Sequence, residues 1–209
     1  MKVAVSYLKS QKSKEETLSL LDKSLADFIH VDLMDGVFVP ENNLNLEETI
    51  SLLKDRQKPL DIHLMLEEPI KIVSQLSFLK PAYITIHVET SNVEECLSAI
   101  KKHQVRCGLA INPETKIETI YPYLDFIDQI LVMSVHPGKG GQTFIPDTVE
   151  KLKSLSTLKK EKNLSFLISV DGGINKETIS LVKDYVDMVV SGSFVCMHDE
   201  YDAQINLLK

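Results

Sequence analysis

Short apolar runs recur along the chain and alternate with longer stretches in which charged residues separate the apolar ones. The short runs predict β-strands at residues 3–8, 28–33, 60–66, 83–88, 105–111, 127–135, 166–170 and 186–190. Stretches with apolar residues three and four positions apart predict helices, for example at residues 14–25, 46–54, 70–79, 93–103 and 148–160. The pattern therefore predicts eight β-then-α units.

Strands that alternate with helices at this spacing imply right-handed crossovers and a parallel sheet. Eight units in 209 residues fit an α/β fold of the compact (β/α)8 TIM-barrel type. A doubly wound open sheet is the alternative, because a count of units does not show whether the sheet closes. No Gly/Ser-rich or Pro-rich linker divides the sequence, so we expect residues 1–209 to form one barrel domain.

The composition is that of an ordinary globular protein, with 44% hydrophobic and 25% charged residues. A net charge of −7 argues against nucleic acid or an anionic membrane as a partner, although a local basic pocket can still hold a small phosphate. No segment reaches the roughly 18 apolar residues of a membrane span, and the first residues do not resemble a signal peptide. Three cysteines without CxxC-type spacing support neither a disulfide framework nor a thiolate metal site, so we expect a cytoplasmic location.

Polar residues gather where the predicted strands end. Side chains two positions apart on a strand point the same way, so His30 and Asp32 would project together where the second strand opens into a loop. In a (β/α)8 barrel the active site is built at this end of the strands. Other strands end near Ser6, His63, His87, Glu89, Asn112, Ser134, His136 and Asp171. This clustering is not the pattern of a purely structural core.

Two imidazoles and two carboxylates in this group form a set suited to one metal ion: His30, Asp32, His63 and Asp171. Nitrogen and oxygen ligands of this kind suit zinc, iron, manganese or cobalt and do not select among them. Any one of these residues alone is more often a satisfied core or loop residue. Four of them at the mouth of one barrel favour a metal site.

Glycines after the last strands predict a phosphate site. Residues 171–174 (Asp-Gly-Gly-Ile) follow the seventh strand and residues 191–193 (Ser-Gly-Ser) follow the eighth, where barrels often bind phosphate. Glycine lets backbone N–H groups approach a phosphate closely. Residues 136–144, which contain three glycines and Lys139, suit a mobile loop over a ligand, with a plain flexible loop as the alternative.

Taken together, these motifs resemble the ribulose-phosphate 3-epimerase family. The matching stretches are HVDLMDGVFVP (30–40), DIHLMLEEP (61–69), ITIHVE (84–89), GLAINPET (108–115), LVMSVHPGKGGQTFIP (131–146), VDGGI (170–174) and SGS (191–193). They occur in the family's order and span nearly the whole chain. The resemblance implies a ribulose-phosphate-binding barrel and an isomerase of the pentose phosphate pathway that interconverts D-ribulose 5-phosphate and D-xylulose 5-phosphate.

The resemblance also implies a role for each site residue. One divalent metal ion would be held by His30, Asp32, His63 and Asp171, and the two aspartates would transfer protons on opposite faces of the sugar. The substrate-binding residues would be Ser6, Met34, His63, Met65, Met133, Gly141, Gly172, Gly173, Gly192 and Ser193. We also expect a homo-oligomer and a small sugar phosphate as the ligand.

The chain departs from the family's pattern in four stretches that would face the substrate. Residues 41–45 lack the glycine usual in that loop, and Lys139 replaces an aromatic residue. His136 stands where an acidic or small polar residue is common. Residues 5–10 (Val-Ser-Tyr-Leu-Lys-Ser) lack the usual Pro-Ser start and Ser-Ala-Asp ending of the first strand.

Because of these departures, two alternatives stay open. One is a 3-epimerase of a related sugar phosphate such as D-allulose 6-phosphate, although relatives with that substrate usually replace the Gly172-Gly173 pair. The other is a non-catalytic barrel that binds a sugar phosphate. Related decarboxylases carry Asp-x-Lys-x-x-Asp on the second strand. The same spacing in this chain reads His30-x-Asp32-x-x-Asp35, without the lysine. A decarboxylase is therefore disfavoured.

Overall fold

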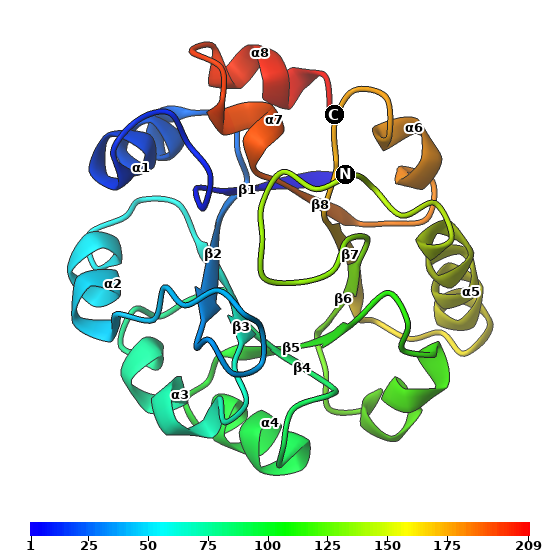
Figure 1. The fold of residues 1–209 in the computed structure, drawn as a ribbon. Coiled ribbons are helices and arrows are strands. Elements are labelled where there is room, and N and C mark those ends of the chain that lie inside the picture. The colour runs from blue at the N-terminus through cyan, green and yellow to red at the C-terminus, as the bar shows by residue number, and fades with distance from the viewer.

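The computed structural model describes residues 1–209 and forms a closed barrel of eight parallel strands surrounded by helices (Figure 1). The strands follow one another around the barrel in chain order: β1 (Lys2–Ser6), β2 (Phe28–Met34), β3 (Leu60–Met65), β4 (Tyr83–His87), β5 (Arg106–Ile111), β6 (Gln129–Met133), β7 (Leu167–Asp171) and β8 (Met188–Ser191). Parallel pairing of β8 with β1 closes the sheet. The predicted barrel is confirmed and the open sheet is excluded.

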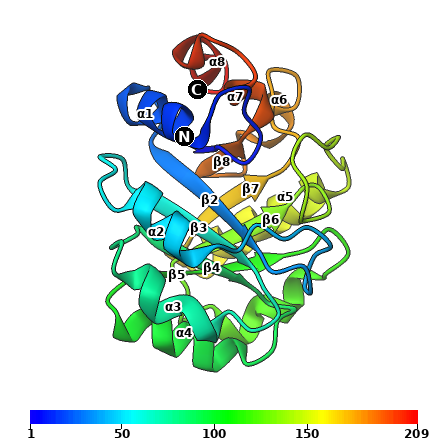
Figure 2. The ribbon, with the colours of Figure 1, turned by 60° about the vertical axis from the view of Figure 1, so that its left-hand side comes forward.

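At least one helical segment follows every strand and covers the outside of the barrel (Figures 1 and 2). These segments are α1 (Lys14–Lys23), α2 (Leu46–Leu53), α3 (Ile70–Ser77), α4 (Val93–Lys102), η1 (Ile117–Tyr123), α5 (Thr148–Glu161), α6 (Ile179–Val182), α7 (Ser193–Cys196) and α8 (Tyr201–Asn206). The segment after β5 is a 3₁₀ helix. It contains Pro122, which lacks the N–H group that an α-helix needs at that position.

The two faces of each strand are buried in different surroundings. On β2 the side chains of Ile29, Val31 and Leu33 belong to the large apolar layer between the barrel and the helices. Each such side chain stabilises the fold by roughly 1.5–3 kcal/mol when fully buried. The alternate residues His30 and Asp32 point into the barrel, because successive side chains of a strand face opposite ways. Period-two alternation thus separates packing residues from chemically active ones.

The barrel interior is apolar at one end and polar at the other. A second apolar cluster contains Ala4, Phe28, Tyr83, Ala110, Leu131, Met133, Val135, Met188 and Val190. Three of its large members, Phe28, Tyr83 and Met188, begin their strands and fill the N-terminal end of the barrel. The opposite end, where the strands finish, holds the histidines and carboxylates together with apolar side chains such as Met65 and Met133.

Strand register decides which of these polar side chains become neighbours. On β2 and β3, Asp32 lies beside His63, and on β6 and β7, Met133 lies beside Asp171. A shift of one residue would turn these side chains towards the helices and bring apolar ones into the barrel. The apolar layer therefore stabilises the register on which the site depends.

Side-chain caps fix the starts of the first two helices. Ser13 Oγ accepts the backbone N–H of Glu16 at 3.2 Å, and Asn45 Oδ1 accepts the N–H of Glu48 at 3.1 Å. Such caps typically stabilise a helix by about 1 kcal/mol. The unusual segment 41–45 therefore ends in a residue that begins α2.

Some predicted boundaries were wrong by a few residues. The sixth strand, predicted at 127–135, is the shorter β6. Ser134, just after it, donates to the carbonyl of Asp171 from its N–H at 2.8 Å and from its hydroxyl at 2.9 Å. The first strand ends at Ser6, so Tyr7 and Leu8 already belong to the loop that follows. Both changes lengthen loops at the open end of the barrel.

The three cysteines, Cys96, Cys107 and Cys196, are free and buried. Burial raises the pKa of the Cys107 and Cys196 thiols to about 12, so both are protonated at neutral pH. No helix of the structure combines the length and the apolar character that a membrane crossing requires.

Candidate active site

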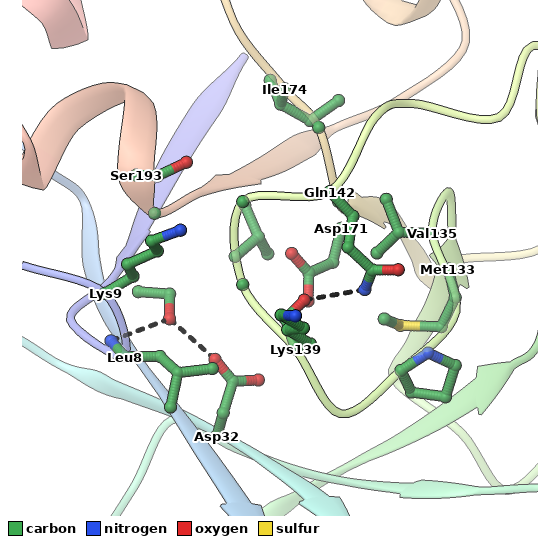
Figure 3. Close-up of a pocket in the computed structure, with 18 of the residues that line it drawn as sticks. Leu8, Lys9, Asp32, Met133, Val135, Lys139, Gln142, Asp171, Ile174 and Ser193 are labelled. Atoms are coloured by element: carbon green, nitrogen blue, oxygen red, sulfur yellow. Dashed lines mark hydrogen bonds between the residues drawn. The ribbon is translucent and has the colours of Figure 1, made fainter. Parts of the chain in front are cut away.

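A cavity of about 430 Å³ opens at the C-terminal ends of the strands. Its walls come from strand ends and from the loops after β1, β6, β7 and β8 (Figure 3). Ten residues predicted from the sequence line it: Ser6, Asp32, Met65, Met133, Gly141, Asp171, Gly172, Gly173, Gly192 and Ser193. The barrel thus gathers into one cavity residues that lie far apart along the chain.

The four predicted metal ligands converge at the base of this cavity. Asp32 Oδ1 lies 3.2 Å from His30 Nε2 and 3.1 Å from His63 Nδ1. Asp171 Oδ2 lies 3.8 Å from the same nitrogen of His30 and 4.0 Å from that of His63. One ligand atom from each residue falls within 4.8 Å of all the others, so the cluster can hold a metal ion.

Hydrogen bonds behind the two histidines decide which ring nitrogens face the cluster. His30 Nδ1 lies 2.7 Å from Asp61 Oδ2, which leaves His30 Nε2 directed at Asp32 and Asp171. His63 Nε2 lies 2.8 Å from His87 Nε2, which leaves His63 Nδ1 directed at the same carboxylates. A metal-binding histidine commonly donates its other N–H in this way. The donor set and its support therefore fit a divalent metal.

His87 and Glu89 extend the support of His63 outward. Burial lowers the pKa of His87 to about 4, so its ring is neutral. His87 Nδ1 lies 3.1 Å from Glu89 Oε2, and Glu89 Oε1 accepts the N–H of Asn112 at 2.9 Å and the hydroxyl of Thr115. The neutral ring of His87 carries one proton. If Nδ1 donates it to Glu89, then Nε2 must accept a hydrogen bond from His63, which places the proton of His63 on Nε2. Their positions at strand ends were predicted, but this role was not.

The two aspartates have pKa values shifted in opposite directions. Burial alone would raise the pKa of Asp32, but the adjacent His30 and His63 hold it well below its usual range. Burial raises the pKa of Asp171 to about 7; His30 offsets part of this shift and the charge of Asp32 adds to it. Burial alone would lower the pKa of His30, but Asp32 and Asp61 raise it well above its ordinary value.

Ser6 and two methionines complete the wall next to the aspartates. The Ser6 hydroxyl donates to Asp32 Oδ2 at 2.7 Å and accepts the N–H of Leu8 at 3.3 Å (Figure 3). Met65 and Met133 line the cavity. Met34, predicted beside them, is buried against Met65 and Val39 and does not line the cavity.

Glycines dominate the other end of the cavity. Gly173 has φ +65°, and a Cβ atom there would lie 2.5 Å from the backbone nitrogen of Phe144. The loop after β6 is braced by Gln142, whose Nε2 donates to the carbonyls of His136 at 2.6 Å and Lys139 at 2.7 Å. This end brings exposed backbone and two lysines, Lys9 and Lys139, to the cavity, which suits an anion.

Two other residues singled out in the sequence do not belong to the histidine–aspartate cluster: Asp35 lies in the turn after β2, and His136 lines the rim of the cavity. Asp35 accepts the N–H groups of Val37, Phe38 and Glu67 and so stabilises the turn after β2. His136 is exposed at the rim, with its Nδ1 3.4 Å from Glu114 Oε1.

Asp61, Gln142 and Lys9 are residues of the site that sequence reasoning missed. The signal for Asp61 was present, because it lies two positions before His63 and must share its face of β3. No comparable local signal marks Lys9 or Gln142. Their places depend on the paths of loops.

A closed (β/α)8 barrel whose cavity joins a histidine–aspartate cluster able to hold a metal ion to a glycine-rich, basic end defines the class of this protein as a barrel enzyme. The sequence agrees with this class and narrows it. The model of the "Ribulose-phosphate 3 epimerase family" matches residues 2–196, and the chain belongs to this family.

Individual relatives agree with the family match. A ribulose-phosphate 3-epimerase of Aquifex aeolicus is 35% identical over 186 residues, which cover 88% of this chain and 84% of the relative. One from Helicobacter pylori is 39% identical over 174 residues, covering 82% and 80%. Among solved structures, a 3-hexulose-6-phosphate synthase from Salmonella typhimurium has a TM-score of 0.70 at 17% identity and covers 100% of this chain and 96% of that one. At 17% identity, this similarity is evidence for a shared fold alone.

Proposed function

We propose that this chain is a metal-dependent epimerase that inverts C3 of D-ribulose 5-phosphate to give D-xylulose 5-phosphate. The observation that carries the proposal is that two carboxylates, Asp32 and Asp171, line one cavity beside two imidazole ligands. Relatives named ribulose-phosphate 3-epimerase, 35–39% identical over most of the chain, support the same activity.

Epimerisation needs two proton transfers at one carbon. Loss of the C3 proton, next to the C2 ketone, gives an enediolate, and inversion requires a new proton on the opposite face. A pair of carboxyl groups meets this need when one starts ionised and the other protonated. In our proposal Asp32 and Asp171 serve the two faces and exchange these roles in the reverse reaction.

The other residues hold this pair in place. His30, Asp32, His63 and Asp171 would bind the metal ion, which when bound stabilises negative charge developing on the substrate oxygens as a Lewis acid. Ser6 fixes the orientation of the Asp32 carboxylate through its hydroxyl. Met65 and Met133 provide an uncharged wall that excludes water from the reacting carbon.

The identity of the metal is a separate part of the proposal. Two nitrogen and two oxygen donors suit zinc, iron, manganese or cobalt. Protein stripped with a chelator and reloaded with each ion in turn should regain activity with at least one of them at one ion per chain. Full activity in the stripped protein would contradict metal dependence.

The assay that tests the function compares D-ribulose 5-phosphate with D-allulose 6-phosphate on metal-loaded protein. We expect the pentose phosphate to be turned over with the higher kcat/KM. A higher kcat/KM for D-allulose 6-phosphate would identify the hexose phosphate as the preferred substrate. Metal binding without exchange of the substrate's C3 proton in deuterated water would instead favour a non-catalytic binding protein.

Three further expectations remain predictions from the sequence: a homo-oligomer, a cytoplasmic location and no nucleic-acid partner. The last two follow from the cysteine pattern and the net charge of −7. Light scattering on the purified protein measures the oligomeric state directly.

A further inference from the structure

The loop after β1 brings a lysine to the glycine-rich end of the cavity. Lys9 Nζ lies 2.7 Å from the point that a Cβ atom on Gly141 would occupy. The Lys9 side chain lines the cavity, and in Figure 3 its ammonium group lies on the side of Ser193. Lys9 therefore sits among the glycines for which a phosphate ligand was predicted.

The charge of Lys9 is not neutralised within the chain. Lys9 takes part in no salt bridge, whereas six other lysines do. The contrast is sharpest with Lys12, three residues further on, whose Nζ lies 2.9 Å from Asp199 and 3.9 Å from Glu16. The ammonium of Lys9 is thus available to a ligand.

The surroundings of Lys9 favour an anion. Asp32 and Asp171 are the two carboxylates that line the cavity, and both belong to the histidine cluster at its base. Because the whole chain carries a net charge of −7, a dianionic ligand approaches a protein of like sign. A cation at the entrance offsets this repulsion locally and raises the rate and strength of binding.

We propose that Lys9 binds the phosphate group of the substrate through a charge-assisted hydrogen bond and that this contact sets substrate affinity rather than the rate of chemistry. The inference rests on the proposed function and adds a residue to it. Lys9 belongs to the segment 5–10, where the sequence departs from the pattern of the family it resembles. Lysine binds phosphate as a point charge on a flexible stem, so it needs no fixed geometry to contribute.

The test compares Lys9→Met with Lys9→Arg and with Lys12→Met in the metal-loaded full-length protein. Lys9→Met should raise the KM for D-ribulose 5-phosphate about tenfold, which corresponds to about 1.4 kcal/mol, and leave kcat within about twofold. Lys9→Arg keeps the charge and should restore most of the affinity. Lys12→Met removes a charge that Asp199 already neutralises and should leave KM unchanged.

Inorganic phosphate provides a readout that does not depend on turnover. Its dissociation constant, measured by calorimetry, should rise in Lys9→Met by a factor similar to that in KM and should stay constant in Lys12→Met. Added salt should weaken phosphate binding more in the wild type than in Lys9→Met, because exposed charges are screened.

The outcomes separate the two proposals. A wild type that binds phosphate through Lys9 but does not epimerise D-ribulose 5-phosphate would overturn the proposed function and leave the phosphate contact standing. Equal KM and phosphate affinity in Lys9→Met and Lys12→Met would overturn the role of Lys9, as would a fall in kcat at constant KM. Lys9 is exposed on a loop, so folding of these variants is checked simply by their melting temperatures.

Discussion

The two ends of the cavity are built in opposite ways. At the base, His30 and His63 are fully buried on strands, and hydrogen bonds to Asp61 and His87 hold their rings. At the entrance, glycine-rich loops and an exposed lysine, Lys9, surround the opening. At the base, packing and hydrogen bonds hold the side chains in fixed orientations. At the entrance, the loops present backbone groups and a positive charge.

This difference follows from what each end has to do. Proton transfer and metal binding need atoms held within about 0.5 Å of a working geometry, which packed strands supply. A phosphate dianion is nearly symmetric, so backbone N–H groups and a flexible cation can bind it without a precisely fixed orientation. We therefore expect substitutions at the base to change catalysis and metal content, and those at the entrance to change substrate affinity.

The largest effect should follow from Asp171→Asn. Loss of an ionisable group that transfers a proton typically costs about 10²- to 10⁴-fold in rate, so we expect kcat to fall by about 10³-fold with the melting temperature retained. Metal content is measured in the same samples, because Asp171 is also a proposed ligand. Asp184→Asn, on the exposed surface, is the matched control. Near-normal turnover in Asp171→Asn would contradict the assignment of proton transfer to two aspartates.

The next effect should come from Asp61→Asn, behind the metal cluster. Its carboxylate accepts from His30 Nδ1 at 2.7 Å, and a neutral amide holds that ring less firmly. Loss of such a supporting contact typically lowers metal affinity about 10- to 100-fold. Competition with a chelating dye measures this affinity, and an unchanged value would show that Asp61 does not direct the histidine.

A smaller effect, and one on affinity, should follow from Gly173→Ala at the entrance. A methyl group there meets the backbone of Phe144 at a positive φ, so the two loops must move apart. We expect KM to rise about tenfold and the free energy of unfolding to fall by about 1–3 kcal/mol. Gly140→Ala is the matched control for stability, because its Cβ would lie at an ordinary 3.4 Å from Lys9 Cβ. Equal stability of the two variants would contradict the expectation that crowding against the Phe144 backbone destabilises Gly173→Ala.

The smallest effect should come from Ser6→Ala. It removes one hydrogen bond to Asp32, worth about 1 kcal/mol, and should lower kcat/KM about fivefold without loss of metal. Ser180→Ala on the surface of α6 serves as control. A loss as large as that of Asp171→Asn would mean that Ser6 takes part in the chemistry itself.

Much of the base of the cavity could be predicted from the sequence, but little of its support could. His30 and Asp32 project together because they lie two positions apart on one strand, and this rule needs no tertiary information. The contact between His63 and His87 depends instead on how two neighbouring strands are aligned and on the rotamers of two rings. Met34 is a different case: the resemblance to the family implied a place in the substrate site, whereas in the structure Met34 packs against Met65 and Val39.

The sequence by itself determined the eight β-then-α units, the face of each strand that carries polar groups, and the residue types of the metal cluster. These depend on periodicity within a few residues and on the rule that barrel sites form at strand ends. The tertiary structure decided closure through β8 and β1, the distances between Asp32 and Asp171 and the histidines, and the place of Lys9 beside Gly141. These are contacts between segments far apart in the chain, and they are set by register and loop paths, which no local pattern encodes.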